Sequence, residues 1–267
     1  MKKTSGQVKP VTKPFVKGNP TDERTFKSAL GFMGVIIMTA FISFLVCTMI
    51  NPTNTVLRVL LNLAVEALIL MIFFNQAVQK GTDGVARGEI LLQREAKGRS
   101  FSASEKAMCF HPLKGFLIGL IGTVPLLLMT IVLALTTTRQ ITGIGVLPGW
   151  MSGYLRIAEI GDPLTAYTAA PGMGLTDILR LAIRIFLMPF VAMVGAENRD
   201  GMLLLERLSP LLALLPAAAY GIGYLMGPAE RTKVHTDIAQ NKRVRARREK
   251  KARQARQRKP QGPQQLN

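Results

Sequence analysis

The sequence predicts an all-α polytopic integral membrane protein, a bundle of four or five hydrophobic helices with basic, disordered termini. Hydrophobic residues make up 48% of the chain and the mean hydropathy is +0.25, although 34 lysines and arginines accompany 16 acidic residues. These values arise when long charge-free runs alternate with strongly charged ones. That alternation is typical of membrane proteins rather than soluble ones.

The chain begins with a basic arm followed by two apolar runs. Residues 1–28 hold seven lysines and arginines and no apolar periodicity, so we expect a mobile basic arm in the cytoplasm. Residues 29–50 carry no charge and no small-residue cleavage site follows them, which indicates a retained transmembrane helix rather than a secretion signal. After a polar turn, residues 55–77 form a second transmembrane helix, and the two spans are expected to make a hairpin.

A polar stretch, residues 78–114, is expected to be a cytoplasmic loop with room for a small helical hairpin. Four glycines divide its short helical pattern into pieces: Gly81, Gly84, Gly88 and Gly98. Near its end Cys109 and His111 stand in a C-x-H spacing. Two such residues are too few for a metal site, so we interpret them as a turn before a helix that Pro112 starts.

The next two segments are a span and an external loop. Residues 115–137 predict a transmembrane helix with an interior proline, which neighbouring helices can accommodate. Residues 138–177 are rich in glycine and proline and are expected to lie outside. Within them Trp150 and Tyr154 share one helical face, which predicts an interfacial helix anchored in the headgroup plane. A soluble cap over the helix ends is the alternative.

The last two hydrophobic segments differ in how well they suit a membrane span. Residues 178–195 contain Arg180 and Arg184, and each arginine at a span centre costs about 2.5–3.5 kcal/mol. We therefore expect this segment to be re-entrant or interfacial, with a fifth full span as the alternative. Residues 204–226 form a clear transmembrane helix, and residues 227–267 form a basic tail.

The orientation follows from the basic residues. The arm and the 78–114 loop hold seven lysines and arginines each, and the forty residues after Gly227 hold thirteen. All three segments should face the cytoplasm under the positive-inside rule. Four full spans satisfy this condition and five do not, so we predict both termini in the cytoplasm and the plasma membrane as the location.

A polar stripe runs along the second span. Arg58, Asn62 and Glu66 recur every four residues and share one helix face, with Glu66 roughly 16 Å from the helix start, near the bilayer centre. A carboxylate there is either a working protonatable or cation-binding group, a permanently protonated acid, or half of a structural ion pair. We favour the structural ion pair, with Arg184 as the partner and Arg180 as the other candidate.

The tail is the strongest compositional signal. Its basic residues can bind anionic lipid headgroups or the phosphates of RNA and the ribosome, and no aromatic residue is present among them for base stacking. The candidate contacts are Lys242, Arg243, Arg245, Arg247, Arg248, Lys250 and Lys251.

No nucleotide-binding loop, nucleophile elbow or zinc-protease motif occurs in the sequence. We therefore predict no enzymatic activity, no cofactor and no metal site. The predicted function is a transport-related subunit or a membrane organiser. The alternative is an insertase-like or ribosome-associated membrane factor, because a few helices, an embedded charge and a basic tail are also the general plan of basic-tailed membrane insertases, an analogy of architecture only.

Overall fold

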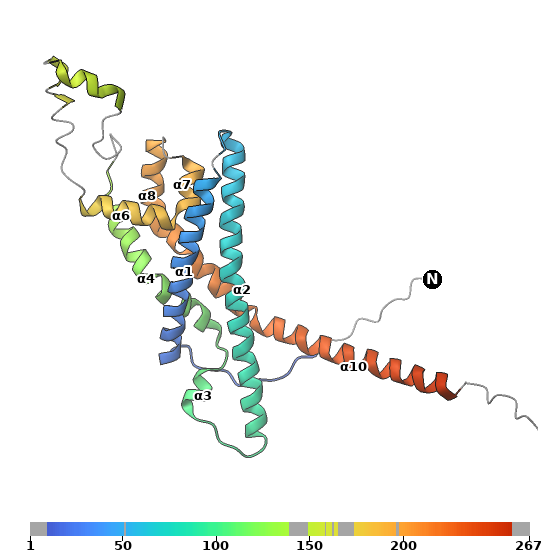
Figure 1. Cartoon of the computed structure of the whole chain (residues 1–267). Helices are drawn as coiled ribbons and strands as arrows, with labels where there is room; N and C mark the ends of the chain where they lie inside the picture. Colours follow the sequence, from blue (N-terminus) through green and yellow to red (C-terminus); the bar gives the residue numbers. More distant parts are fainter. Residues whose placement is uncertain are drawn as a thin grey trace, which may run out of the picture.

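A computed structural model shows a helical protein with an elongated bundle and one projecting helix (Figure 1). It describes residues 10–50, 52–138, 149–157, 159–161, 163–164, 174–195 and 198–257. These residues contain no strand, and four of their helices are long and apolar enough to cross a membrane. The all-helical class with several apolar spans is confirmed, whereas the choice between four and five spans stays a prediction.

Three long helices run along the bundle: α1 (Glu23–Met49), α2 (Thr55–Glu95) and α4 (Pro112–Thr136). They contain the predicted spans. Asn54 caps α2, because its side chain accepts hydrogen bonds from the amides of the first turn at 2.9 and 3.3 Å. At the start of α4 the proline occupies the first turn, as the turn interpretation expects.

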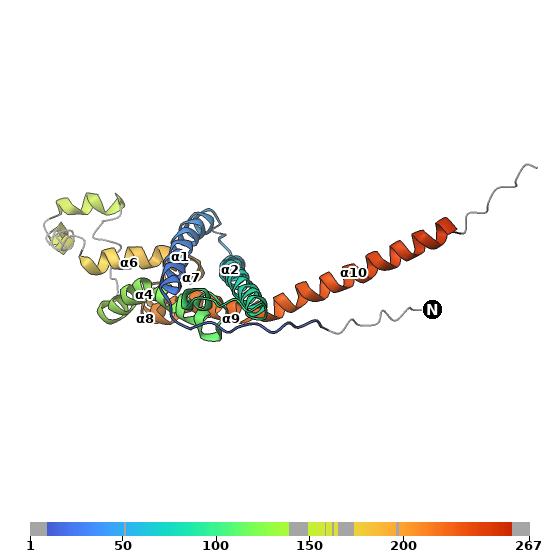
Figure 2. The ribbon, with the colours of Figure 1, turned by 90° about the horizontal axis from the view of Figure 1, so that it is seen from below.

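The last predicted span is a helix that is interrupted at two positions. Single residues separate α8 (Arg199–Ala213), α9 (Leu215–Leu225) and α10 (Gly227–Gln257). Pro216 and Pro228 stand at the second position of the helix that follows each break, where a missing N–H is tolerated. The helix bends at these breaks, and α10 leaves the bundle at a wide angle (Figures 1 and 2).

Between α4 and α8 lie two shorter helices, α6 (Leu175–Phe186) and α7 (Met188–Val194). Figure 1 shows α6 running across the direction of α1 and α2, and α7 turning along it. Neither reaches the ~20 residues that a span needs. A short helix α3 (Ala103–Ala107) precedes α4, and a 3-10 helix η1 (Gly149–Arg156) follows it.

The core forms around α9, which packs against both α2 and α4. Tyr220 is fully buried there beside Phe32, with ring centroids 4.4 Å apart, and Phe73 meets Phe32 edge to face. Glycines let the helices approach closely: a methyl group added at Gly119 would lie 2.8 Å from the carbonyl oxygen of Ala217. The first two spans are antiparallel neighbours in sequence but touch little, because α7 packs against both α1 and α2.

The polar stretch after the second span departs from the prediction. Residues 78–95 continue α2 without a break, so the expected division by glycines is wrong for this part. The physical reason is packing: Gly81 lies against the backbone of Tyr224, Gly84 against Phe110 and Gly88 against Val16. These glycines permit close approach inside a helix, and the packing outweighs their low helix propensity of about 1 kcal/mol.

The termini are also more ordered than expected. Residues 10–22 form an extended segment that docks on the bundle: the Val16 amide donates to the Gly88 carbonyl at 3.2 Å and the Gly18 amide to the Phe110 carbonyl at 2.9 Å. The prediction of a mobile arm is wrong for these residues. Disorder is likewise wrong for residues 227–257, which form α10.

The three basic segments lie at one end of the bundle. The Val11 amide donates to Thr236 Oγ1 at 3.1 Å, which ties the arm to α10. The same arm contacts the 78–95 part of α2, as described above. Segments that the positive-inside rule assigns to one compartment are therefore adjacent in the fold, while the side of the membrane on which they lie stays a prediction.

Candidate functional site

Glu66 is half-buried and lines a small cavity of about 40 Å³, whose other walls come from α1, α4, α6, α7, α8 and the start of α9. The polar residues of α1 in its wall, Thr39 and Ser43, donate their hydroxyl hydrogens to carbonyls of their own helix at 2.8–2.9 Å. Across the part of the chain that the structure describes, no hydrogen bond or ion pair reaches Glu66. The rest of the wall is mostly apolar, including Phe73 and Phe190. A cavity of this size can hold a water molecule.

The remaining members of the stripe make contacts of their own. Asn62 is buried, and its side-chain amide donates to the Arg58 carbonyl at 2.8 Å rather than to Glu66. The Arg58 guanidinium lies against Gly195, at the end of α7, where the backbone has a φ of +84°. A Cβ at that glycine would approach Arg58 Nη2 to 3.0 Å, so both the conformation and the space favour glycine. The stripe therefore connects the start of α2 with α7.

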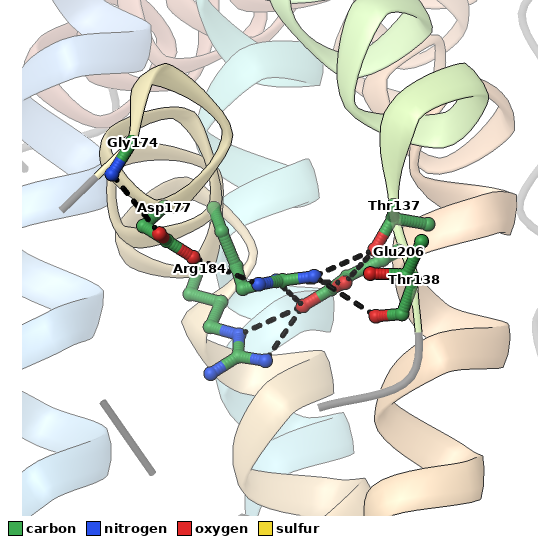
Figure 3. Close-up of polar contacts among 7 residues, drawn as sticks. Thr137, Thr138, Gly174, Asp177, Arg184 and Glu206 are labelled. Carbon is green, nitrogen blue, oxygen red and sulfur yellow. Dashed lines mark hydrogen bonds and ion pairs between the residues drawn. The ribbon is translucent and has the colours of Figure 1, made fainter. Parts of the chain in front are cut away.

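The favoured ion pair between Glu66 and Arg184 is wrong. Arg184 instead bonds the carboxylate of Glu206 in α8, with Nη2 at 2.6 Å and Nε at 3.1 Å (Figure 3). The reason is geometric: the Arg184 side chain of α6 is directed at Glu206 of α8, whereas α6 reaches the cavity beside Glu66 with Phe186. Arg180, the second candidate, also pairs with Glu206, at 3.0 Å.

The Glu206 cluster joins α4, α6 and α8. Glu206 is only 4% exposed, and besides the two arginines it accepts a hydrogen bond from the Thr137 hydroxyl. Arg180 also donates to Asp177 Oδ1 at 3.1 Å and to the Thr138 carbonyl at 3.1 Å (Figure 3). Every buried charge in the cluster has a partner, which is the condition for a stable buried ion pair. The sequence analysis does not identify Glu206. A signal was present, because the last apolar span contains this carboxylate and the preceding hydrophobic segment contains two arginines one helical turn apart.

A second cluster connects α2 with α10 at the opposite end. Glu89 is buried, accepts hydrogen bonds from Arg231 at 2.9 and 3.1 Å, and lies 2.7 Å from His235 Nε2. Burial alone would raise the pKa of Glu89, but the hydrogen bonds and charges of its two partners outweigh burial and lower that pKa. The cluster fixes the first turns of α10 to the extension of α2. The sequence analysis does not identify Glu89 or its partners, because α2 and α10 are far apart in the chain and no local pattern connects them.

The other predicted residues fall in three places. Trp150 and Tyr154 lie on η1, a 3-10 helix rather than the expected α-helix, with Trp150 70% exposed; their anchoring role stays a prediction. His111 caps α4, its Nδ1 accepting the Leu113 amide at 3.3 Å. Cys109 is buried, which raises the pKa of its thiol. No group of three His, Cys, Asp or Glu side chains that could hold a metal occurs among the described residues.

The candidate lipid or RNA contacts of the tail are all exposed on the outer part of α10: Lys242, Arg243, Arg245, Arg247, Arg248, Lys250 and Lys251. They surround a helix that projects from the bundle (Figure 2). A basic helix of this kind presents its charges on all sides rather than along one face.

Comparisons with known proteins give no relative. The chain matches no family model, no curated protein and no solved structure.

Proposed function

We propose that the protein is a transport-related subunit of the plasma membrane, and that Glu66 is the group that takes up and releases a proton or binds a cation. The observation that carries the proposal is the carboxylate of Glu66 in an apolar span, beside a small cavity and without a cationic partner among the described residues. Both termini lie in the cytoplasm in this arrangement, because the three basic segments share one end of the bundle.

The two embedded glutamates differ in a way that supports this role. Glu206 is held by two arginines and a threonine, as expected of a structural carboxylate. Glu66 is half-buried beside a mostly apolar cavity wall, and no arginine or threonine among the described residues bonds it. An ionisable group inside a span is costly, and one that is not neutralised by a fixed partner is more consistent with a working carboxylate than with a membrane organiser.

Reconstitution of the full chain in liposomes tests the proposal. With a membrane potential imposed and a pH dye or a sodium dye trapped inside, we expect a proton or cation flux that Glu66→Gln abolishes and Glu66→Asp partly preserves. Glu95→Gln is the matched control, because it removes an exposed carboxylate from the polar end of the same helix. Equal abundance of the variants is checked first. A flux that is the same in wild type and Glu66→Gln refutes the proposal.

One observation favours a second candidate, an insertase-like or ribosome-associated membrane factor. The outer half of α10 is fully exposed, strongly basic and held clear of the bundle (Figure 1). Such a helix suits contact with RNA phosphates or with anionic lipid. Ribosomal RNA that co-purifies with the full chain, and is lost on truncation after Ile238, would support this candidate; equal RNA recovery from both forms would exclude it. That cut leaves the Glu89 cluster intact.

A further inference from the structure

A basic crevice of about 170 Å³ lies where α1, α2, α4 and α9 meet. It is distinct from the cavity beside Glu66, which shares none of its lining residues. Four cationic side chains line it: Arg24, Lys80, Arg87 and Lys114. One carboxylate, Asp83, lines it as well. The crevice is therefore strongly electropositive.

The two arginines of the crevice both contact the sulfur of Met108, which is a weak hydrogen-bond acceptor. Arg24 from α1 and Arg87 from α2 each direct Nη1 at the sulfur of Met108, the Arg87 contact being 2.9 Å. A thioether is a weak hydrogen-bond acceptor and carries no negative charge. Within the described residues neither guanidinium has a carboxylate partner. Two like charges that meet at one weak acceptor form a site whose natural occupant is an anion.

The lysines add to this field. Lys114 is buried, and its ammonium donates to the Ala107 carbonyl at 2.6 Å, so it is held in place by a neutral group. The carboxylate with the largest effect on the Lys114 ammonium is Asp22, at the start of α1. Lys80 lines the crevice and has no ion pair among the described residues. Together these groups leave positive charge in excess at a partly enclosed position.

The crevice lies at the level where several apolar runs end. In α1 the uncharged run begins just after Lys27, in α2 it ends just before Lys80, and in α4 it begins just after Lys114. Figure 1 shows the starts of α1 and α4 at the same end of the bundle, beside the lower part of α2. In a bilayer that spans these runs, this level is that of the lipid phosphates on the side of the three basic segments.

An adjoining cavity of about 540 Å³ extends from the crevice between α1 and α2. Arg24, Ser28 and Lys80 border both spaces. The further walls combine the apolar Phe32 and Tyr220 with Lys27 and Gln76, and a Cβ added at Gly31 would meet nothing within 4 Å. A space that continues from a cationic crevice past Phe32 and Tyr220 can take the glycerol and the first acyl carbons of a phospholipid.

We propose that this crevice binds a phosphate group, and that its source is the headgroup of an anionic phospholipid whose glycerol and first acyl carbons occupy the adjoining cavity. Arg24 and Arg87 bind the phosphate oxygens in place of the Met108 sulfur, and Lys80 and Lys114 supply further positive charge. The site recruits or retains anionic lipid at the cytoplasmic rim of α1 and α2. It does not depend on the role of Glu66.

Binding of lipid to the purified full chain in neutral detergent tests the site. The probes are fluorescent phosphatidylglycerol, fluorescent phosphatidylcholine and inorganic phosphate as a competitor. We expect phosphatidylglycerol to bind more tightly than phosphatidylcholine, and Arg24→Gln and Arg87→Gln each to weaken it about fivefold, the equivalent of one basic residue near a lipid surface. Lys97→Gln removes an exposed charge from outside the crevice and should change the affinity by less than about twofold.

Two further variants separate the possible sources of the phosphate. Gly31→Leu places a side chain in the adjoining cavity and removes no cationic group, so it should weaken phosphatidylglycerol binding and leave inorganic phosphate unaffected. Met108→Leu removes only the sulfur acceptor, so lipid binding should persist, which shows that the arginines do not merely hold the methionine.

The proposal is overturned if Arg24→Gln and Arg87→Gln weaken phosphatidylglycerol binding no more than Lys97→Gln does. A soluble phosphate compound replaces the lipid as the ligand if inorganic phosphate displaces the lipid completely and Gly31→Leu has no effect. Melting temperatures of all variants are recorded beside the binding data, and Arg87→Lys, which keeps the charge, replaces Arg87→Gln if the latter fails to fold.

Discussion

Replacing Glu206 by glutamine should destabilise the bundle strongly, because it leaves two arginines without their carboxylate. Removal of one partner from a buried ion pair costs about 3–5 kcal/mol. The Arg180 side chain is 7% exposed and belongs in this range, whereas Arg184 is 29% exposed and is partly screened by solvent. Arg180 also keeps its bonds to Asp177 and the Thr138 carbonyl. We therefore expect a net loss of about 3 kcal/mol.

The assay is thermal unfolding of the full chain in detergent, followed by the fluorescence of a thiol-reactive dye that reports the two buried cysteines. A loss of about 3 kcal/mol corresponds to a decrease in Tm of about 6–12 °C for a chain of this size. Glu105→Gln is the control: it makes the same chemical change in an exposed pair with Arg94 and should leave Tm nearly unchanged.

A compensating variant checks the mechanism. Simultaneous replacement of Glu206, Arg180 and Arg184 by leucine removes the whole charge cluster, and it should restore most of the lost Tm because no buried charge remains unpaired. If Glu206→Gln melts within about 2 °C of the wild type, Glu206 is not the neutralising centre of this cluster and the reasoning fails.

The remaining predictions concern the opposite end of the bundle and the helix contacts. Because its partners lower the folded-state pKa of Glu89, the carboxylate stabilises the docking of α10 above the ordinary pKa of glutamate, and this contribution is lost as the pH falls through the folded-state value. Hydrogen exchange at the first turns of α10 should therefore be slow at neutral pH and become faster on strong acidification. In the Glu89→Gln variant the same amides should exchange fast at neutral pH. Slow exchange in this variant would contradict the role of the cluster. Gly119→Ala should lower the stability of the fold by about 1–3 kcal/mol, because its methyl group meets the Ala217 backbone. Gly34→Ala is the control: its methyl group meets nothing within 4 Å, so the fold should be equally stable or more stable. Equal melting temperatures for the two variants would show that α4 and α9 do not pack as described.

Much of the architecture was predictable from the sequence because its strongest signals are local. Long, mostly apolar runs locate the apolar helices, and Pro112 with His111 marks the start of α4. Arg180 and Arg184 mark a hydrophobic segment that forms the two short helices α6 and α7, whereas its place in the membrane stays a prediction.

The site was harder to predict because it depends on which helix faces which. The sequence predicts Arg184 as the partner of Glu66, yet in the fold Glu206 is the carboxylate within reach of Arg184. Gly81, Gly84 and Gly88 have low helix propensity, and only the close approach of Tyr224, Phe110 and Val16 explains why α2 continues through them. The Glu89 cluster could not be predicted either, because it depends on the packing of α10 against α2 and its partners lie 142 and 146 residues from Glu89.

Covalent labelling with an apolar carbodiimide tests the role of Glu66 most directly, because this reagent modifies membrane-embedded carboxylic acids in their protonated form. The account predicts that Glu66 is labelled in the intact protein and that labelling decreases as the pH is raised. Glu206, paired with two arginines, should stay unlabelled and serves as the internal control. Peptide mass spectrometry identifies the modified residue, and Glu66→Gln must abolish the signal. Absence of labelling at Glu66 over the whole pH range in which the protein stays folded would contradict the account.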